Sequence, residues 1–213
     1  MKTILLLGAT GAVGGAFLKL ALEHPRVGRI VAPSRKALPF HAKLENPIVD
    51  FAHLPEDAPW WKSDVAVCAL GSTIAQAGSK EAFFKIDHNY VLNAATLILQ
   101  AKTPCFIYNS SMGAHATSRS FYLATKGKIE QSLNALSFAS TYHFRPSLLI
   151  ASNRPKFRFG ESCMALFLKF FDRLIPQSYK AISVENVARA MLIEALNPKA
   201  GVHIINSGEI QRS

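Results

Sequence analysis

Short apolar runs alternate with longer segments of mixed polarity along most of this chain. Runs of about four to eight apolar residues that end at Gly, Pro or Asp are typical of buried strands. They occur at 2–7, 29–32, 47–51, 64–70, 104–108, 140–144 and 201–206. Helical segments stand between several of them, at 16–22, 80–102, 119–136 and 183–196, the last with Ser183 as its cap. Strands that alternate with helices predict an α/β fold, in which a parallel sheet is covered by helices on both faces.

The pattern changes after Pro146. Residues 152–162 contain Asn, Pro and Gly and predict a loop, whereas 163–175 is apolar and rich in Phe. We expect one domain over residues 1–213, with 146–182 as a small substrate-side or lid region and a small C-terminal appendage to the sheet. The basic, Phe-rich segment 154–173 fits two interpretations, a lid or contact surface, or an amphipathic helix packed in the core.

The first predicted strand ends in spaced glycines and leads at once into a helix. Gly8, Gly11 and Gly14 let the backbone approach a ligand closely, and a helix N-terminus offers free N–H groups to an anion. This arrangement holds the pyrophosphate of a dinucleotide in doubly wound, Rossmann-like folds. The alternative is that small residues only allow close packing at this turn. The predicted contacts of the phosphates are Gly8, Thr10, Gly11, Ala12, Val13 and Gly14.

Composition narrows the class of protein. The chain has 213 residues, of which 49% are hydrophobic and 18% charged, which suits a globular domain with a sizeable core. No run reaches the ~18 apolar residues that a membrane span needs. A cleaved signal peptide is not expected, because its removal would delete the phosphate loop. Three scattered cysteines predict reduced thiols and a cytoplasmic location.

The net charge of +10 has two explanations. One is nucleic-acid binding. The other is a solvated basic surface with a site for an anionic cofactor, and it fits better because the basic residues are scattered and form no recognition pattern. We therefore expect no specific nucleic-acid partner. The seven histidines show no metal-ligand spacing, so no metal site is predicted.

A basic loop follows the second predicted strand. In dinucleotide-binding folds this strand ends at the adenosine ribose, where an acidic residue binds the 2′-hydroxyl of NAD and an arginine accommodates the 2′-phosphate of NADP. The chain carries Ser34, Arg35 and Lys36 here and no carboxylate. Arginine forms charge-assisted, bidentate contacts with phosphate. These residues favour NADP(H) over NAD(H), although a solvated basic loop would look the same.

Two further strand ends carry residues that suit the cofactor. Asp50 and Phe51 end the third predicted strand, where the acid would accept the adenine amino group or, equally well, cap a turn. Ala69, Leu70 and Gly71 end the fourth, and their small size would let the cofactor ribose lie close.

Reactive side chains follow the fifth predicted strand. Ser110 and Ser111 come at its end, and Tyr122 and Lys126 lie four residues apart on the next helix, so both project from one face. A nearby ammonium favours the phenolate form of tyrosine and so lowers its pKa. A serine hydroxyl would hold a substrate carbonyl oxygen while Tyr122 moves its proton. The alternative is a packed tyrosine and a solvated lysine that are four apart by chance.

These motifs together resemble the short-chain dehydrogenase/reductase superfamily, in its atypical, extended-like branch, over most of the chain. Residues 70–126 especially resemble the Tat-interacting oxidoreductase-like group and its bacterial relatives. The resemblance implies a Rossmann fold, NADP(H) binding, Tyr122 as general acid/base, Lys126 on the nicotinamide ribose and Ser111 on the substrate. Ser110 is the alternative to Ser111 and also a predicted cofactor contact. The resemblance further implies that residues 146–149 line the nicotinamide end, with Pro146 and Leu148 as the predicted cofactor contacts. Two departures are that Asp87 replaces an Asn common in relatives, and that Ser111 lies only eleven residues before Tyr122.

The sequence therefore predicts an NADP(H)-dependent oxidoreductase that transfers hydride to or from a small carbonyl or alcohol substrate. The region after Pro146 is short for a sugar-nucleotide enzyme, which favours a small substrate. The alternative is an NADP(H)-binding regulatory or protein-interaction module with little or no turnover. A homodimer or another protein partner is compatible with either.

Overall fold

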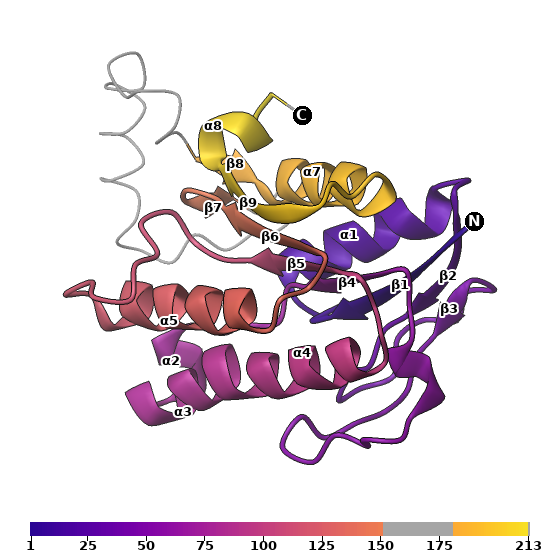
Figure 1. The fold of residues 1–213 in the computed structure, drawn as a ribbon, viewed down its shortest axis with the longest axis horizontal. Coiled ribbons are helices and arrows are strands. Elements are labelled where there is room, and N and C mark those ends of the chain that lie inside the picture. The colour runs from indigo at the N-terminus through magenta and orange to yellow at the C-terminus, as the bar shows by residue number, and fades with distance from the viewer. Residues whose placement is uncertain (151–180, 213) are drawn as a thin grey trace.

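A computed structural model describes residues 1–150 and 181–212 of the chain. Within these residues the centre of the molecule is a seven-stranded sheet in the order β3-β2-β1-β4-β5-β6-β9 (Figure 1). All its neighbouring strands are parallel. The strands are β1 (Lys2–Leu7), β2 (Val27–Val31), β3 (Leu44–Glu45), β4 (Val65–Cys68), β5 (Cys105–Asn109), β6 (Ser140–Arg145) and β9 (Gly201–Asn206).

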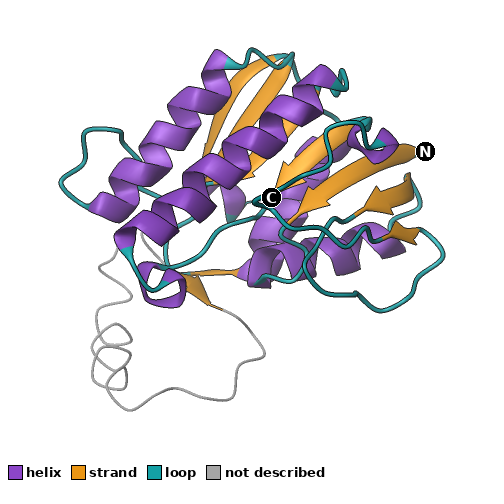
Figure 2. Cartoon of the chain, turned by 90° about the horizontal axis from the view of Figure 1, so that it is seen from below, coloured by secondary structure: helices purple, strands orange, loops and turns teal. Residues whose placement is uncertain are grey.

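Helices cover both faces of this sheet, as the alternating pattern predicts. They are α1 (Ala12–Glu23), η1 (Pro59–Trp61), α2 (Ile74–Ala77), α3 (Lys80–Phe84), η2 (Lys85–Tyr90), α4 (Val91–Gln100), α5 (Phe121–Ala135), α7 (Val184–Leu196) and α8 (Ser207–Ile210). On one face α1 and α7 pack together, and on the other α4 and α5 lie side by side, which Figure 2 shows from below. The prediction of a Rossmann-like, doubly wound α/β fold is confirmed.

The core consists of two apolar layers divided by the sheet. Phe17 and Met191 lie in the layer under α1 and α7, whereas Ile98 and Ile129 lie in the layer under α4 and α5. Both faces of the central strands are buried, and Leu5 and Leu6, which point to opposite faces, are each 0% exposed. This explains why the strands appear in the sequence as continuous apolar runs rather than as alternating patterns.

The prediction of a third strand over residues 47–51 is wrong. The strand next to β2 is the short β3, and residues 47–51 contribute only an isolated bridge between Ser34 and Ile48. Pro47 has no N–H to donate to a strand ladder. The side chain of Asn46 also turns back to donate to the Ala32 carbonyl at 2.6 Å. Regular pairing therefore ends at Glu45.

The long helix predicted over 80–102 is present, but its middle turn is widened. Ser79 caps it by accepting a hydrogen bond from the Ala82 N–H, and α3, η2 and α4 then follow without a break. The η2 segment is a π-helix, in which hydrogen bonds span one residue more than in an α-helix. Such insertions are frequent at functional sites because they change which side chains face inward.

The C-terminal part confirms the predicted helix cap. Ser183 accepts a hydrogen bond from the Asn186 N–H at the start of α7. Before it, β8 (Ile182–Ser183) pairs with β7 (Leu149–Ile150) in a separate two-stranded sheet. The predicted loop at 152–162, the apolar run at 163–175 and the Phe-rich segment 154–173 lie outside the described residues. None of the described helices is both long and apolar enough to span a membrane.

The glycine turn after β1 is tightly packed. Gly8 has a φ of +86°, and a Cβ on it would lie 2.5 Å from the Ala69 carbonyl carbon. A Cβ on Gly14 would lie 2.1 Å from the Gly8 carbonyl oxygen. Only glycine lets β1, α1 and the end of β4 approach this closely.

Gly14→Ala should lower the free energy of unfolding by about 2–3 kcal/mol, because the added methyl group overlaps backbone that has no room to move. Gly15→Ala is the matched control on the same helical turn, since its Cβ would meet its nearest neighbour, the Ala9 carbonyl oxygen, at 3.4 Å. Urea unfolding of both variants measures the difference. Equal stability of the two variants would contradict this account of the turn.

Candidate functional site

Four loops meet at one edge of the sheet, where the parallel strands β1, β4, β5 and β6 end. Pairing between β1 and β4 brings Leu7 beside Cys68, and pairing between β4 and β5 brings Cys68 beside Tyr108. The chain changes direction between β1 and β4, since β2 lies on one side and β5 on the other. This switch point at the carboxyl edge is where ligands bind in open α/β sheets.

The first loop presents an uncapped helix N-terminus to this edge. Gly11 is the N-cap of α1, and no side chain accepts a hydrogen bond from the first turn. The Gly11 N–H itself donates to the Gly8 carbonyl at 2.9 Å and closes the turn. Thr10 and Ala12 are exposed beside it, whereas Val13 is buried beneath. The free N–H groups and the absence of Cβ atoms fit a pyrophosphate.

The three predicted residues of the basic loop after β2 differ in their contacts. The Ser34 hydroxyl is used within the loop, because it donates to the Lys36 carbonyl at 2.6 Å and accepts from the Asn46 amide at 2.8 Å. Arg35 and Lys36 are exposed, and neither makes an ion pair with any described residue. The two cations are therefore available to an anion, whereas Ser34 shapes the loop that carries them.

Asp50 and Phe51 take different positions in the next loop. Asp50 is exposed and caps a turn, accepting from the Ala52 N–H at 2.9 Å, and this hydrogen bond lowers the pKa of its carboxyl group. The turn-capping alternative is thus observed directly. Phe51 is buried and stacks on Tyr90, with the ring centroids 6.5 Å apart.

A buried ammonium group lies where the loop after β4 meets β5. Lys126 is 4% exposed, and its Nζ donates to the Tyr108 hydroxyl at 2.9 Å and lies 2.9 Å from Oδ1 of Asp87. Burial alone would lower the pKa of Lys126, but Tyr108 and Asp87 outweigh it and raise the pKa above its ordinary value. Burial also raises the pKa of the Tyr108 hydroxyl. Lys126 is therefore a charged donor and Tyr108 a neutral acceptor.

The second predicted reactive residue of α5 lies one turn earlier. Tyr122 is half-exposed, and its ring packs on Phe83 with centroids 5.5 Å apart. Tyr122 and Lys126 both belong to α5, four residues apart, the spacing that places two residues on one face of a helix. Lys126 donates its hydrogen bond to Tyr108, a residue that is not among the predicted site residues.

The two serines at the end of β5 differ in exposure. Ser110 is 4% exposed, and its buried hydroxyl has no hydrogen-bond partner among the described residues. Ser111 is half-buried, and its hydroxyl reaches only the Met112 carbonyl, at 3.5 Å. The Met112 N–H donates to the Pro146 carbonyl at 2.9 Å, which joins this loop to the end of β6. The Ser110 hydroxyl is therefore buried without a partner among the described residues, whereas the Ser111 hydroxyl has one long hydrogen bond.

The predicted residues after β6 and β4 also lie at this edge. Pro146 is buried and Leu148 is 64% exposed. Ala69 and Leu70 are half-buried against the Gly8 turn, and Gly71 follows them into solvent. The edge thus collects predicted residues from four separate loops.

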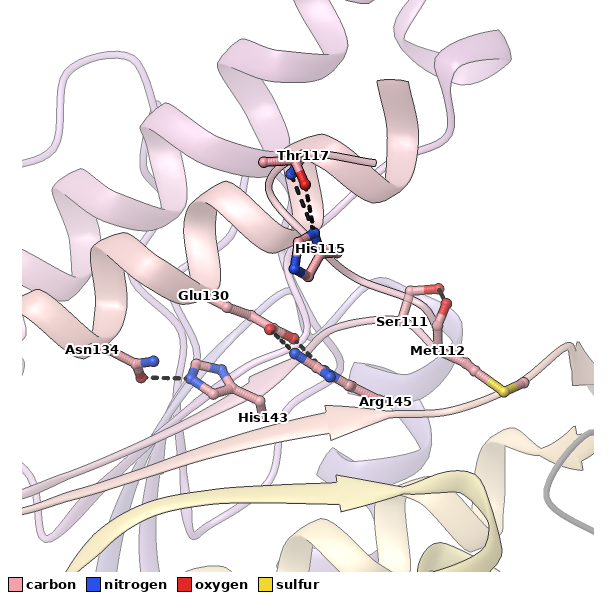
Figure 3. Close-up of polar contacts among 8 residues, drawn as sticks. All are labelled: Ser111, Met112, His115, Thr117, Glu130, Asn134, His143 and Arg145. Carbon is pink, nitrogen blue, oxygen red and sulfur yellow. Dashed lines mark hydrogen bonds and ion pairs between the residues drawn. The ribbon is translucent and has the colours of Figure 1, made fainter. Parts of the chain in front are cut away.

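The inner face of α5 continues as a polar stripe with a partner for each member. Four residues beyond Lys126, Glu130 binds Arg145 of β6 through two hydrogen bonds, one of them 3.0 Å from Nε to Oε1 (Figure 3). Four residues further, Asn134 contacts Nε2 of His143 at 2.7 Å. The helix is therefore fixed to β5 and β6 by paired polar groups rather than by an apolar face alone.

Gly127 brings the serine loop onto this helix. A Cβ on Gly127 would lie 2.2 Å from the backbone of both His115 and Ala116. The loop that carries Ser111 therefore rests directly on α5, close to Lys126 in sequence. His115 in turn contacts the Thr117 hydroxyl at 2.9 Å (Figure 3).

Sequence reasoning missed Tyr108, Gly127 and Glu130. Two of them carried a signal. Tyr108 is two residues before Ser110, the spacing at which residues of an extended chain face the same side. Glu130 continues the four-residue spacing of Tyr122 and Lys126. Nothing in the local sequence distinguishes Gly127 from a weak helix position.

The chain is similar to several known proteins, both in sequence and in structure. Protein HTATIP2 of Rattus norvegicus is 35% identical over 208 residues, which cover 94% of this chain and 84% of that protein. Protein FMP52, mitochondrial, of Meyerozyma guilliermondii is 31% identical over 226 residues, covering 98% and 94%. The solved structure of the enzyme WbmH of Bordetella bronchiseptica, in complex with NAD+, superposes with a TM-score of 0.72 at 15% identity, over 100% of this chain and 79% of that chain. No protein-family model matches the chain.

The cytoplasmic location expected from the cysteine count is wrong. The fungal relatives named FMP52, including that of Saccharomyces cerevisiae, are designated mitochondrial. Cysteine use indicates only that thiols stay reduced, as in the buried Cys68 and Cys105. That property does not distinguish the cytosol from another reducing compartment.

His143 should make the stability of this region depend on pH. Burial lowers the pKa of His143 to about 4, with Glu130 and Arg145 acting in opposite directions. The unfolded chain binds a proton at an ordinary pKa of about 6.5. The folded state therefore loses stability relative to the unfolded chain as the pH falls from about 6.5 toward 4, because only the unfolded chain binds the proton. The free energy of unfolding should fall by about 2 kcal/mol between pH 7.5 and pH 5.

Urea unfolding at both pH values, for wild type and His143→Gln, measures this contribution. The variant should lose less stability than wild type on acidification. His53→Gln, at an exposed histidine, is the control. The same pH dependence in wild type and His143→Gln would contradict the assignment.

Proposed function

We propose that this chain, which belongs to the family of HTATIP2 and FMP52 within the atypical short-chain dehydrogenases/reductases, is an NADP(H)-dependent oxidoreductase. Its substrate would be a small carbonyl or alcohol. One observation carries the proposal. At a single edge of the sheet, an uncapped helix N-terminus with a glycine turn lies at β1, and a buried ammonium lies at β5, one helical turn from Tyr122.

The glycine turn would hold the pyrophosphate of the cofactor. Gly8 and Gly14 let β1, α1 and the end of β4 pack closely, and the first turn of α1 has N–H groups that no side chain caps. The backbone N–H groups of Thr10, Ala12 and Val13 would donate to the phosphate oxygens, favoured by the positive end of the helix dipole, while the Gly11 N–H closes the turn. The residues present therefore fit a dinucleotide.

The adenosine end would meet the exposed cations. Arg35 and Lys36 have no carboxylate partner in the described chain, so their charge is available to a 2′-phosphate. Phe51 would lie near the adenine ring. Asp50 would reach the adenine amino group only beside the hydrogen bond that it already accepts from Ala52.

The nicotinamide end would lie between the loops after β4, β5 and β6. Gly71 would allow the ribose to approach, and Lys126 would donate to its hydroxyl groups. Pro146 and Leu148 would line the ring. The neighbour WbmH is described in complex with NAD+, which supports a nicotinamide cofactor in this fold and leaves the NADP(H) preference to Arg35 and Lys36.

The reaction would need one hydride and one proton. The cofactor, when bound, accepts or supplies the hydride. Tyr122 would donate its phenolic proton to the substrate oxygen in reduction and take it back in oxidation. Ser111, or Ser110 in its place, would donate a hydrogen bond to the same oxygen. The charge of Lys126 would stabilise the phenolate that Tyr122 becomes.

We expect residues 1–213 to act as one cofactor-binding unit with residues 146–182 on the substrate side. WbmH extends beyond the part that this chain covers, because the match spans 79% of that chain.

Arg35→Ala should raise the Kd for NADPH by about tenfold and change the Kd for NADH by less than about twofold, because only NADPH carries the 2′-phosphate. Fluorescence titration of each reduced cofactor measures both constants. Arg189→Ala, at an exposed arginine of α7, is the charge-matched control. An equal loss of affinity for both cofactors would overturn the role of Arg35.

Tyr122→Phe should reduce turnover of a carbonyl panel with NADPH by about 10²–10⁴-fold, since it removes the proton donor. The Kd for NADPH should stay within about twofold of wild type, because the hydroxyl acts on substrate. Tyr142→Phe is the control, because it removes a different tyrosine hydroxyl, one that accepts a hydrogen bond from the Lys199 N–H. Unchanged turnover in Tyr122→Phe would refute the assignment. Tight NADPH binding by wild type without turnover on any substrate would favour the regulatory module.

A further inference from the structure

The side chain of Asn46 closes the basic loop after β2. Asn46 directly follows β3, and its Nδ2 donates to the Ala32 carbonyl at 2.6 Å and to the Ser34 hydroxyl at 2.8 Å. Its Oδ1 accepts a hydrogen bond of 2.8 Å from the Leu38 N–H. A single side chain therefore binds the loop at its start, just before its two cations and again after them.

The partners of Asn46 fix the orientation of its amide group. A side-chain amide presents an N–H₂ donor on one side and a carbonyl acceptor on the other. The Ala32 carbonyl can only accept a hydrogen bond, and the Leu38 N–H can only donate one. A reversed amide would face each of them with a group of the same kind. Both polar ends of Asn46 are therefore used by the loop.

Ser34 extends this network to Lys36. The Ser34 hydroxyl accepts from Asn46 and donates its only proton to the Lys36 carbonyl at 2.6 Å. The backbone of Ser34 is held as well, since its N–H donates to the Pro47 carbonyl and its carbonyl accepts from the Val49 N–H, both at 3.0 Å. With its proton committed to the loop, Ser34 has none to donate to a phosphate and instead orders the backbone around it.

The two cations of the loop extend from this ordered backbone. Arg35 lies between Ser34 and Lys36, both of which are hydrogen-bonded within the loop, and the side chains of Arg35 and Lys36 are exposed. Neither cation forms an ion pair within residues 1–150 and 181–212. The position of the backbone therefore decides where their charge lies. A loop that is ordered before binding spares the ligand the cost of ordering it.

We propose that Asn46 is a positioning residue that sets the preference for NADP(H), because it holds Arg35 and Lys36 where the 2′-phosphate of the cofactor would lie. The inference rests on the cofactor site proposed above. Asn46 acts through the loop rather than on the cofactor, since its amide is already bound by Ala32, Ser34 and Leu38. NAD(H) lacks the 2′-phosphate, so its affinity should not depend on Asn46.

Asn46→Ala tests this inference, because it removes all three hydrogen bonds and leaves both cations in place. We expect the Kd for NADPH to rise about tenfold and the Kd for NADH to change by less than about twofold. Adenosine 2′,5′-bisphosphate should also bind about tenfold more weakly, whereas the Kd for adenosine 5′-monophosphate should stay within about twofold of wild type. Fluorescence titration of the cofactors and calorimetry of the two nucleotides measure these constants.

Further variants separate positioning from general damage. Asn93→Ala is the matched control at an exposed asparagine of α4, and it should leave all four constants unchanged. In a background of Arg35→Ala and Lys36→Ala, Asn46→Ala should change the Kd for NADPH by less than about twofold, because Asn46 acts through these cations. If Asn46→Ala fails to fold, Ser34→Ala breaks only the link to the Lys36 carbonyl and should weaken NADPH about threefold without weakening NADH.

The outcomes distinguish this inference from the function on which it rests. Wild type that binds neither NADPH nor NADH would overturn the proposed function and this inference with it. If wild type binds NADPH and Asn46→Ala, or Ser34→Ala in its place, leaves the ratio of the two cofactor constants unchanged, this inference alone is wrong. That outcome includes equal weakening of both cofactors, since the damage would then be general. A loss of NADPH affinity that persists without Arg35 and Lys36 would also contradict it.

Discussion

A lysine charge buried away from water is the constraint that the surrounding elements satisfy. Lys126 is 4% exposed, and an unpaired ammonium at that depth would be strongly unfavourable. Tyr108 of β5 and Asp87 of η2 supply its partners. The π-helix gives the long helix the extra residue in its middle turn at the position of Asp87. The relative positions of β5, α5 and η2 are thus tied to one nitrogen atom.

Further along α5, other polar side chains are also paired with residues of the sheet. Beyond Lys126, the stripe pairs Glu130 with Arg145 and Asn134 with His143, both on β6. A shift of the helix by one turn would separate every pair at once and leave several buried polar groups unpaired. Such errors cost more than an apolar mismatch, because the desolvation of each group is then uncompensated. Gly127 lets the backbone at His115 and Ala116 lie on this fixed helix, so the serine loop takes its position from it.

Local patterns predicted much of this fold, and long-range contacts account for what they missed. The bounds of β1 and β9 agree with their apolar runs, and Ser183 caps α7, because apolar runs and helix caps are signals that lie within a few residues. The third strand failed because a Pro and an Asn side chain ended pairing at Glu45. Tyr122 and Lys126 were recognisable from their spacing. The pairing of Lys126 with Tyr108 was not, because 18 residues separate them and only the folded sheet brings them together.

The two ends of the candidate site differ physically, and one short segment connects them. The end near α1 offers backbone N–H groups and the exposed side chains of Arg35 and Lys36, whose attraction for an anion is screened by salt. The end near α5 offers Lys126, which is buried and already ordered by its partners, so its geometry depends little on solvent. Residues 69–71 touch both ends, because Ala69 lies against Gly8 and Gly71 lies against the Asp87–Lys126 pair. Three residues of backbone therefore connect the proposed phosphate subsite to the proposed nicotinamide subsite.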